Sequence, residues 1–107
     1  MKREIKFRAK HKRIGGWEFF TLKQVRKVHD LIDWDTVGQS FGLEDKRDIA
    51  MYEGDILQFQ NGKLSEPIAF PKDYAWLKTL TEDVPSAAVE VVGNRIDNSE
   101  LLPRDSR

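Results

Sequence analysis

Residues 4–10 alternate strictly between charged and uncharged side chains, and this pattern limits the fold more than any other stretch of the chain. A period of two is typical of a β-strand with one buried face, because successive side chains of a strand point to opposite sides. The Gly15-Gly16 pair that follows permits a tight reversal, and the apolar run 17–20 fits a returning strand. The chain is therefore predicted to begin as a β-hairpin.

The next segment has helical spacing. Thr21 followed by Gln24 has the pattern of a capping box, and apolar residues recur at helical intervals through residues 22–32. This pattern predicts a short amphipathic helix, although two strands fit the same apolar positions. Beyond it, Gly38 and Gly42 are expected to form turns.

The second half is predicted to contain short strands and one more helix. Residues 49–52 and 55–65 have strand patterns, and Asn61-Gly62 predicts a type I′ turn inside the second of them. A helix is expected over residues 71–83, and a strand over residues 88–92. Together with the first hairpin, these elements indicate a mainly β protein.

Composition limits the class of protein. A chain of 107 residues with 39% apolar and 34% charged side chains predicts one globular domain over residues 1–107. The absence of cysteine excludes disulfides and thiolate metal sites. We find no apolar h-region at the amino terminus and no run near the ~18 apolar residues of a membrane span, so we expect a cytoplasmic protein with no membrane partner.

The charge is polarised along the chain. Residues 1–28 hold ten Lys and Arg against two Glu, a net charge of +8, and the remainder holds eight against sixteen. Such a basic segment can bind nucleic acid, or it can lie against the acidic remainder of its own fold or of a neighbouring subunit. Overall neutrality favours the second interpretation. The candidate binding residues are Lys2, Arg3, Lys6, Arg8, Lys10, Lys12, Arg13 and Trp17.

Each candidate has an alternative structural explanation. The charged side chains of residues 4–10 also suit an edge strand, where charge resists aggregation. Carboxylates and an imidazole could converge on a divalent cation, or they could belong to a solvated helix end. The candidate metal ligands are His29, Asp30, Asp33 and Asp35. We find no catalytic motif and no phosphate-binding loop, so we expect no catalytic residue and no cofactor.

Three separated blocks carry a recognisable pattern, namely residues 3–9, 36–56 and 90–102. The motif residues of the last two blocks are Gly42, Leu43, Asp45, Tyr52, Glu53, Gly54, Asp55, Gly93, Asn94, Leu101 and Leu102. In this order and spacing, the blocks resemble the YopX-like proteins of bacteriophages and prophages. The chain departs from the family at Arg47-Asp48, where the family usually has Asn-Gly, and this change leaves the geometry of that hairpin open.

The resemblance implies a mainly β fold (β or α+β) with one or two short helices. It implies an SH3-like barrel in residues 41–102, an N-terminal hairpin lobe in residues 1–40 and a tail at 103–107. It also implies a phage or prophage origin, hence a bacterial host cytoplasm, with no established catalytic residues.

We therefore expect a non-enzymatic accessory protein that binds nucleic acid or a host protein through its basic N-terminal face, as a homo-oligomer. Two alternatives stay open. One is a divalent-metal-binding protein or enzyme that uses the candidate metal ligands. The other is a purely structural homo-oligomer.

Overall fold

The structure is a computed structural model that describes residues 5–83 and 89–102. It divides into two units, Met1–Ser40 (unit 1) and Phe41–Arg107 (unit 2), each with its own apolar core. The described strands pair antiparallel, and they are accompanied by two α-helices, so the predicted mainly β class is confirmed.

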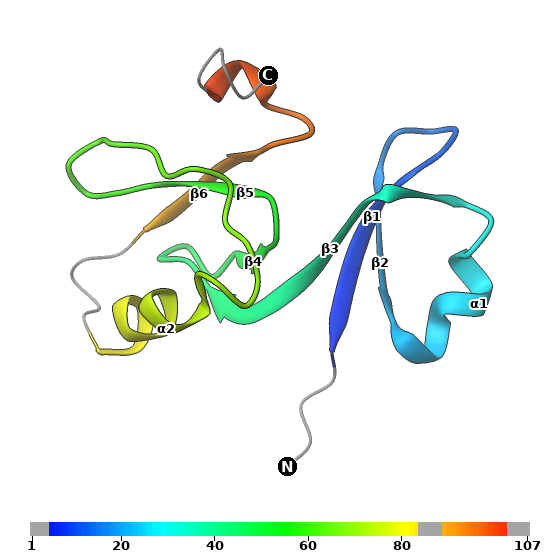
Figure 1. Cartoon of the computed structure of the whole chain (residues 1–107), viewed down its shortest axis with the longest axis horizontal. Helices are drawn as coiled ribbons and strands as arrows, with labels where there is room; N and C mark the ends of the chain where they lie inside the picture. The colour runs from blue at the N-terminus through cyan, green and yellow to red at the C-terminus, as the bar shows by residue number, and fades with distance from the viewer. Residues whose placement is uncertain (1–4, 84–88, 103–107) are drawn as a thin grey trace. The chain divides into compact units, whose positions relative to one another are not determined.

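Unit 1 is built on the predicted hairpin. Strand β1 (Lys6–His11) pairs antiparallel with β2 (Trp17–Thr21), and the chain then forms a 3-10 turn, η1 (Leu22–Gln24), and a short helix, α1 (Val25–Val28). The Thr21 N–H donates to Gln24 Oε1 at 3.0 Å, so the predicted capping interaction forms. Figure 1 shows α1 beside the hairpin.

The predicted helix ends four residues early because Ile32 belongs to the next strand. Strand β3 runs from Ile32 to Glu44 and pairs with β1 on the side away from β2. Ile32 is fully buried with Ala9 and Phe20, and that burial outweighs helical spacing. Gly38 and Gly42 lie inside β3, so the turns predicted there are wrong.

The core of unit 1 lies on one face of the β1–β2–β3 sheet. Ala9, Phe20 and Ile32 are buried there, and Val25 and Val28 of α1 pack against them. The alternation predicted for residues 4–10 therefore has its apolar side toward α1. Its charged side lies on the opposite face of the sheet.

Unit 2 contains the remaining elements. These are β4 (Ala50–Tyr52), β5 (Asp55–Gln58), α2 (Tyr74–Asp83), β6 (Glu90–Asn94) and the 3-10 turn η3 (Ser99–Leu101). The predicted strand at 49–52 and the helix within 71–83 are confirmed. The predicted strand at 88–92 is observed as β6, and its first residue, Ala88, lies outside the described residues.

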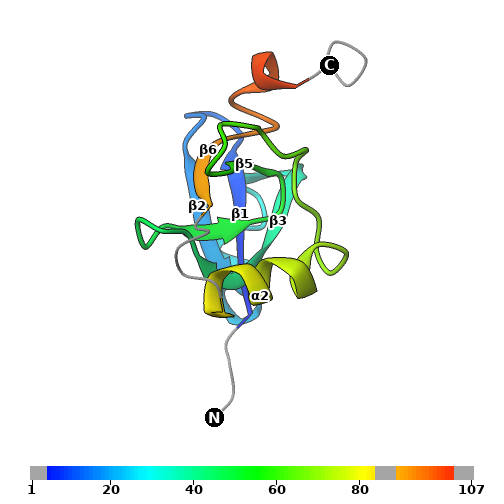
Figure 2. The ribbon, with the colours of Figure 1, turned by 90° about the vertical axis from the view of Figure 1, so that its left-hand side faces the viewer.

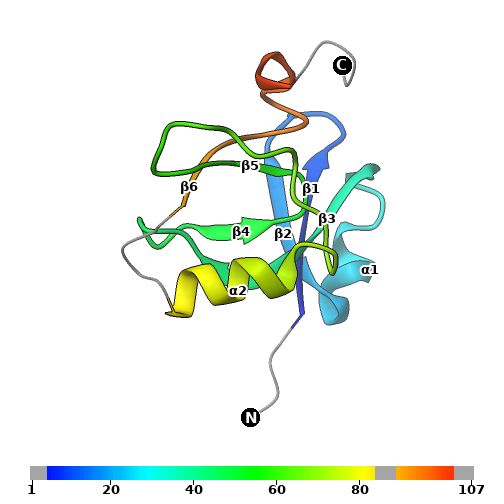
Figure 3. The same cartoon turned by 60° about the vertical axis from the view of Figure 1, so that its left-hand side comes forward.

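The strands form two sheets. The first has the order β2-β1-β3-β4, and the second pairs β5 with β6. In Figures 2 and 3, β4 lies between α2 and the β5–β6 pair. The core of unit 2 includes Phe41, Met51, Leu57 and Leu77, which come from β3, β4, β5 and α2, and Val89, which directly precedes β6.

The strands of residues 5–83 and 89–102 form these two open sheets and no closed barrel. The SH3-like arrangement implied for unit 2 is therefore not confirmed. Within the same residues, no helix has the length and apolar character needed to cross a membrane.

The loop at Asn61-Gly62 closes a hairpin of a different type from the predicted one. A type I′ turn requires a positive φ at both central residues. Gly62 has a φ of +87°, but Asn61 is not among the described residues with positive φ. The Phe59 N–H donates to Lys63 O at 2.8 Å, and the Gly62 N–H donates to Phe59 O at 2.9 Å. These bonds define a three-residue loop whose last position is left-handed. The returning arm pairs only through a bridge between Gln58 and Leu64.

Candidate functional site

The face of unit 1 opposite its core carries the basic side chains of β1. Register places Lys6 opposite Thr21, Arg8 opposite Phe19 and Lys10 opposite Trp17, so these six side chains share one surface. We call this surface the strand face. It brings together four of the predicted binding residues: Lys6, Arg8, Lys10 and Trp17.

The indole ring of Trp17 makes cation–π contacts with two basic side chains of the strand face. Arg8 Cζ lies 4.4 Å from the ring centroid of Trp17, and Lys10 Nζ lies 4.6 Å from the same centroid. Such cation–π contacts are stabilising when the cation sits over the ring. Arg8 is also only 9% exposed. A buried guanidinium and a covered indole ring are poorly placed to contact phosphates or bases.

The exposed cations of unit 1 lie mainly outside the strand face. Lys12 and Arg13 are exposed in the loop between β1 and β2, and Lys23, Arg26 and Lys27 are exposed on η1 and α1. We call these five side chains the cationic surface. Within the described part of the chain, no carboxylate oxygen comes within 4.0 Å of any of them. Their charge is therefore available to a ligand.

Three of these five residues were not among the predicted binding residues. Lys23, Arg26 and Lys27 follow an i, i+3, i+4 pattern, which places them on the solvent side while Val25 and Val28 pack inward. The charge count over residues 1–28 included them, but only the helix direction shows that they share a face. Lys6 is exposed as well, and Lys2 and Arg3 lie outside the described residues.

The candidate metal ligands do not converge. His29 Nδ1 lies 3.0 Å from Asp30 Oδ1, but Asp33 Oδ1 accepts the backbone N–H of Asp35 at 3.0 Å. The His29 ring lies 5.4 Å from the Trp34 ring, and Trp34 Nε1 donates to the carbonyl of His29. Over residues 5–83 and 89–102, no three His, Asp or Glu side chains gather as a metal site.

The central motif residue Asp45 holds two parts of unit 2 together. Its Oδ1 accepts the N–H groups of Arg47 at 2.8 Å and Ile49 at 2.9 Å, and its Oδ2 accepts that of Val91 at 2.8 Å. Asp45 is buried, with 5% of its surface exposed. Its carboxylate therefore closes the loop before β4 and fixes that loop to β6.

Other motif residues have similar structural roles. Asp55, which is 1% exposed, accepts the N–H of Tyr52 at 2.8 Å. Asn94 Oδ1 accepts the N–H groups of Ile96 and Asp97 and so forms the turn after β6. Hydrogen bonding inside turns explains these positions without a ligand.

Gly93 is required by close packing. A Cβ atom on Gly93 would lie 2.7 Å from Cγ and Oδ1 of Asn98, whose Oδ1 accepts the N–H of Asn94 at 3.0 Å. Glu53 accepts the N–H of Phe70 at 3.3 Å and is also held within the unit. The remaining motif residues lie in or beside these same strands and turns, and they are Gly42, Leu43, Gly54, Leu101 and Leu102.

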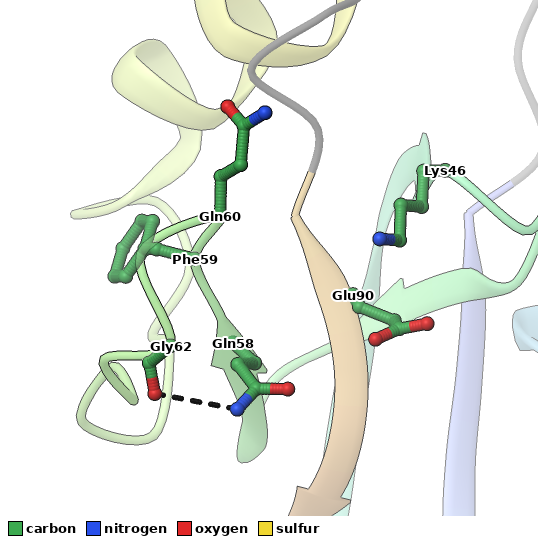
Figure 4. Close-up of a pocket in the computed structure, with 6 residues that line it drawn as sticks. All are labelled: Lys46, Gln58, Phe59, Gln60, Gly62 and Glu90. Carbon is green, nitrogen blue, oxygen red and sulfur yellow. Dashed lines mark hydrogen bonds between the residues drawn. The ribbon is translucent and has the colours of Figure 1, made fainter.

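A polar cavity of about 210 Å³ lies in unit 2. The view in Figure 4 places Lys46 and Glu90 on one side and Gln58, Phe59, Gln60 and Gly62 on the other. Two lining groups are already engaged, since Gln58 Nε2 donates to Gly62 O and Glu90 pairs with Arg47 Nε at 3.2 Å. The cavity is also smaller than the ~300 Å³ at which typical ligand pockets begin. We therefore base no function on it.

Comparison with known proteins gives one match. A search of curated proteins and a search of solved structures each find nothing similar. The family model described as YopX protein matches residues 2–103, nearly the whole length. The chain therefore belongs to the YopX family.

Proposed function

We propose that this protein is a non-enzymatic nucleic-acid-binding accessory protein of a phage or prophage, and that it binds through the cationic surface of unit 1. One observation carries the proposal: five exposed Lys and Arg side chains have no carboxylate partner among the described residues. Lys and Arg side chains without a carboxylate partner attract phosphates, and their binding releases the counterions that surround the nucleic acid.

Spacing supports phosphate contacts by the helix. Lys23 of η1 and Lys27 of α1 are separated by about 6–8 Å along the axis, because an α-helix rises about 1.5 Å per residue and a 3-10 helix about 2.0 Å. That separation is close to two nucleotide steps, since each step is about 3.4 Å along a strand. Contacts of this kind position a protein on nucleic acid without reading its sequence. Binding is accordingly expected to depend little on base sequence.

Family membership fits a phage-type protein but names neither a role nor a partner. A host protein with an acidic surface is the alternative partner for the same cations. The SH3-like arrangement of unit 2 stays a prediction, and so does the homo-oligomer. Placement in the host cytoplasm is part of the same proposal.

The test is a salt titration of binding to labelled single-stranded and duplex DNA by fluorescence anisotropy. Five phosphate contacts predict that log K falls against log salt with a slope of about −3.5 for single strands and about −4.5 for duplex. Neutralising two helix cations in Arg26→Gln/Lys27→Gln should reduce the single-strand slope by about 1.4. Lys12→Gln/Arg13→Gln should reduce it by a similar amount.

A matched control uses exposed lysines of unit 2. Lys63→Gln/Lys78→Gln removes the same charge, and it should leave both slopes unchanged. Equal losses in the control and the test variants would mean that only net charge matters. No binding to either DNA at about 50 mM salt would reject nucleic acid and leave the host-protein alternative.

A further inference from the structure

We propose that His11 is a positioning residue that holds Arg13 of the cationic surface in place, and that protonation of the His11 imidazole weakens nucleic-acid binding; this inference rests on the function proposed above. His11 is the last residue of β1. Its Nδ1 atom accepts the backbone N–H of Arg13 at 3.1 Å and that of Ile14 at 3.3 Å. The tip of the loop between β1 and β2 therefore bends around the imidazole.

The base of this loop is closed by backbone bonds that do not involve the imidazole. The His11 N–H donates to Gly16 O at 2.8 Å, and the Gly15 N–H donates to His11 O at 3.2 Å. The Lys12 N–H donates to Leu31 O at 2.8 Å, so the backbone of Lys12 is fixed as well. A change in the imidazole should therefore leave the hairpin closed and act on the residues after Lys12.

The imidazole can accept the two loop bonds in one protonation state only. Nδ1 is an acceptor while the ring is neutral and carries its proton on Nε2. A proton on Nδ1 turns the acceptor into a donor, which then faces the backbone N–H groups of Arg13 and Ile14. A histidine side chain ordinarily takes up this proton between about pH 5 and 8. Acidification through this range should therefore release Arg13 from its fixed position.

The surroundings of His11 offer a protonated ring no ion pair in exchange for these bonds. Over residues 5–83 and 89–102, no carboxylate oxygen comes within 4.0 Å of the imidazole. The charged residues of the elements around it are Lys10, Lys12 and Arg13 on its own strand and loop, Glu18 on β2, Arg26 and Lys27 on α1, and Asp30, Asp33 and Asp35 in the turn before β3 and in β3 itself. Register places Asp33 opposite Lys10, whereas His11 lies opposite Ile32 and so on the other face of the sheet.

Acid has two opposing effects on binding. Protonation adds one positive charge to unit 1, but the half-buried ring is turned into the loop, so its charge acts on phosphates at a distance and is screened by salt. Release of Arg13 weakens one direct phosphate contact. One contact corresponds to about 0.7 in the single-strand salt slope, which is about 5-fold in affinity at about 0.1 M salt. We therefore expect the loss of the contact to exceed the gain from the added charge.

The experiment compares the wild type with His11→Asn and His11→Ala in the anisotropy assay, with single-stranded DNA at pH 8 and pH 5. His11→Asn is the matched variant, because an asparagine side-chain oxygen can accept the same loop N–H groups and does not titrate. At pH 8 it should bind as the wild type does. At pH 5 the wild type should bind about 2- to 5-fold more weakly than His11→Asn, although it carries one more positive charge. His11→Ala should bind about 2- to 5-fold more weakly than His11→Asn at both pH values.

A double-mutant cycle shows whether His11 acts through Arg13. In an Arg13→Gln background, His11→Asn and His11→Ala should bind alike, because the side chain that they position differently is gone. An Arg26→Gln background removes the same charge from α1 and should keep the full difference between them. His29 is present in every protein compared, so its own protonation cancels. A difference that survives in the Arg13→Gln background would reject the positioning role.

The remaining outcomes separate this inference from the proposed function. Tighter binding by the wild type than by His11→Asn at pH 5 would show that His11 acts only as an added cation, and the positioning role would be rejected while the cationic surface stands. If no protein binds DNA at either pH, the proposed function fails. The role of the imidazole is then decided by NMR: the amide signals of Arg13 and Ile14 should follow the protonation of His11 in the wild type and stay unchanged in His11→Asn. Amide signals insensitive to pH would reject it. Thermal melting at both pH values checks that each variant is folded.

Discussion

Asp45 is the residue on which the hairpin before β4 and strand β6 both depend. It is buried, and its two carboxylate oxygens accept three backbone N–H groups. In the sequence, the same residue is one of the motif residues of the block at residues 36–56. The three bonds assign it to the scaffold.

Removal of this carboxylate is expected to destabilise the protein strongly. In Asp45→Ala, the N–H groups of Arg47, Ile49 and Val91 lose a charged acceptor, and each hydrogen bond to a charged group contributes about 1.5–3 kcal/mol. We expect a loss of at least about 3 kcal/mol in the free energy of unfolding, measured by urea denaturation. Asp30→Ala should change it by less than about 0.5 kcal/mol, because the Asp30 side chain is 97% exposed. A small loss for Asp45→Ala would contradict the role described here.

Two hairpin loops of unit 2 have the same backbone geometry with different residues. In one loop, the Asp45 N–H donates to Ile49 O and the Asp48 N–H donates to Asp45 O. In the other, the Phe59 N–H donates to Lys63 O and the Gly62 N–H donates to Phe59 O. The left-handed position is Asp48 in the first loop, with φ +63°, and Gly62 in the second, with φ +87°. The YopX-like pattern has glycine where Asp48 stands, so this chain keeps the loop with a less suitable residue.

Substitutions at the two positions should therefore have opposite effects. Asp48→Gly relieves a left-handed non-glycine residue and should stabilise the protein by about 0.5–1 kcal/mol. Gly62→Ala should destabilise it by about 1 kcal/mol through backbone strain alone, since nothing lies within 4 Å of the added Cβ. Thermal melting of both variants gives the test. The same sign for both would show that the loops are not equivalent.

The start of α2 is held by Asp73, the residue just before the helix. Its Oδ2 accepts the Ala69 N–H at 2.9 Å, and its Oδ1 accepts Trp76 Nε1–H at 2.8 Å. Burial raises the pKa of this carboxyl, but the two hydrogen bonds and the nearby charge of Lys72 outweigh burial and hold the pKa below its ordinary value of 3.8. A carboxyl with a lowered folded-state pKa stabilises the fold above its unfolded pKa, and this contribution is lost as the pH falls through the folded one.

Asp73→Asn should accordingly be less stable than the wild type near pH 7, and the difference should shrink as the pH falls below about 4. Urea denaturation at several pH values measures it. Trp76→Phe removes one of the two hydrogen-bond donors to Asp73. In the Trp76→Phe protein, Asp73→Asn should therefore cause a smaller pH-dependent loss of stability than it does in the wild type, but still a detectable one. A difference that stays constant down to about pH 2 would show that the effect does not come from the charge.

The two units carry opposite net charges. Unit 1 holds ten Lys and Arg against five Asp and Glu, and unit 2 holds eight against thirteen, so their net charges are +5 and −5. Opposite charges on two units allow one copy to attract another, which is the basis for proposing a homo-oligomer. Exposed charges attract each other less as salt shortens the Debye length from about 10 Å at 0.1 M.

The mass in solution should therefore depend on salt. We expect a multiple of 12.5 kDa at about 50 mM salt and the monomer mass at about 500 mM, measured by light scattering. Arg26→Glu/Lys27→Glu should shift the low-salt mass toward the monomer, whereas Lys63→Glu/Lys78→Glu should not. A mass of 12.5 kDa in both buffers would reject the oligomer, and an oligomer insensitive to salt would reject its electrostatic basis.

Features that depend on a local pattern could be predicted from the amino-acid sequence. Alternation at residues 4–10, the Gly15-Gly16 turn and the capping pair at Thr21 each act through neighbours in the chain, so the first hairpin and the start of the helix follow from them. The three motif blocks likewise identified the family. Features that depend on residues distant in the chain could not be predicted from the sequence and are visible only in the folded protein. Ile32 left the helix because Ala9 and Phe20 bury it, and Asp45 became a scaffold residue because Val91 reaches it from β6.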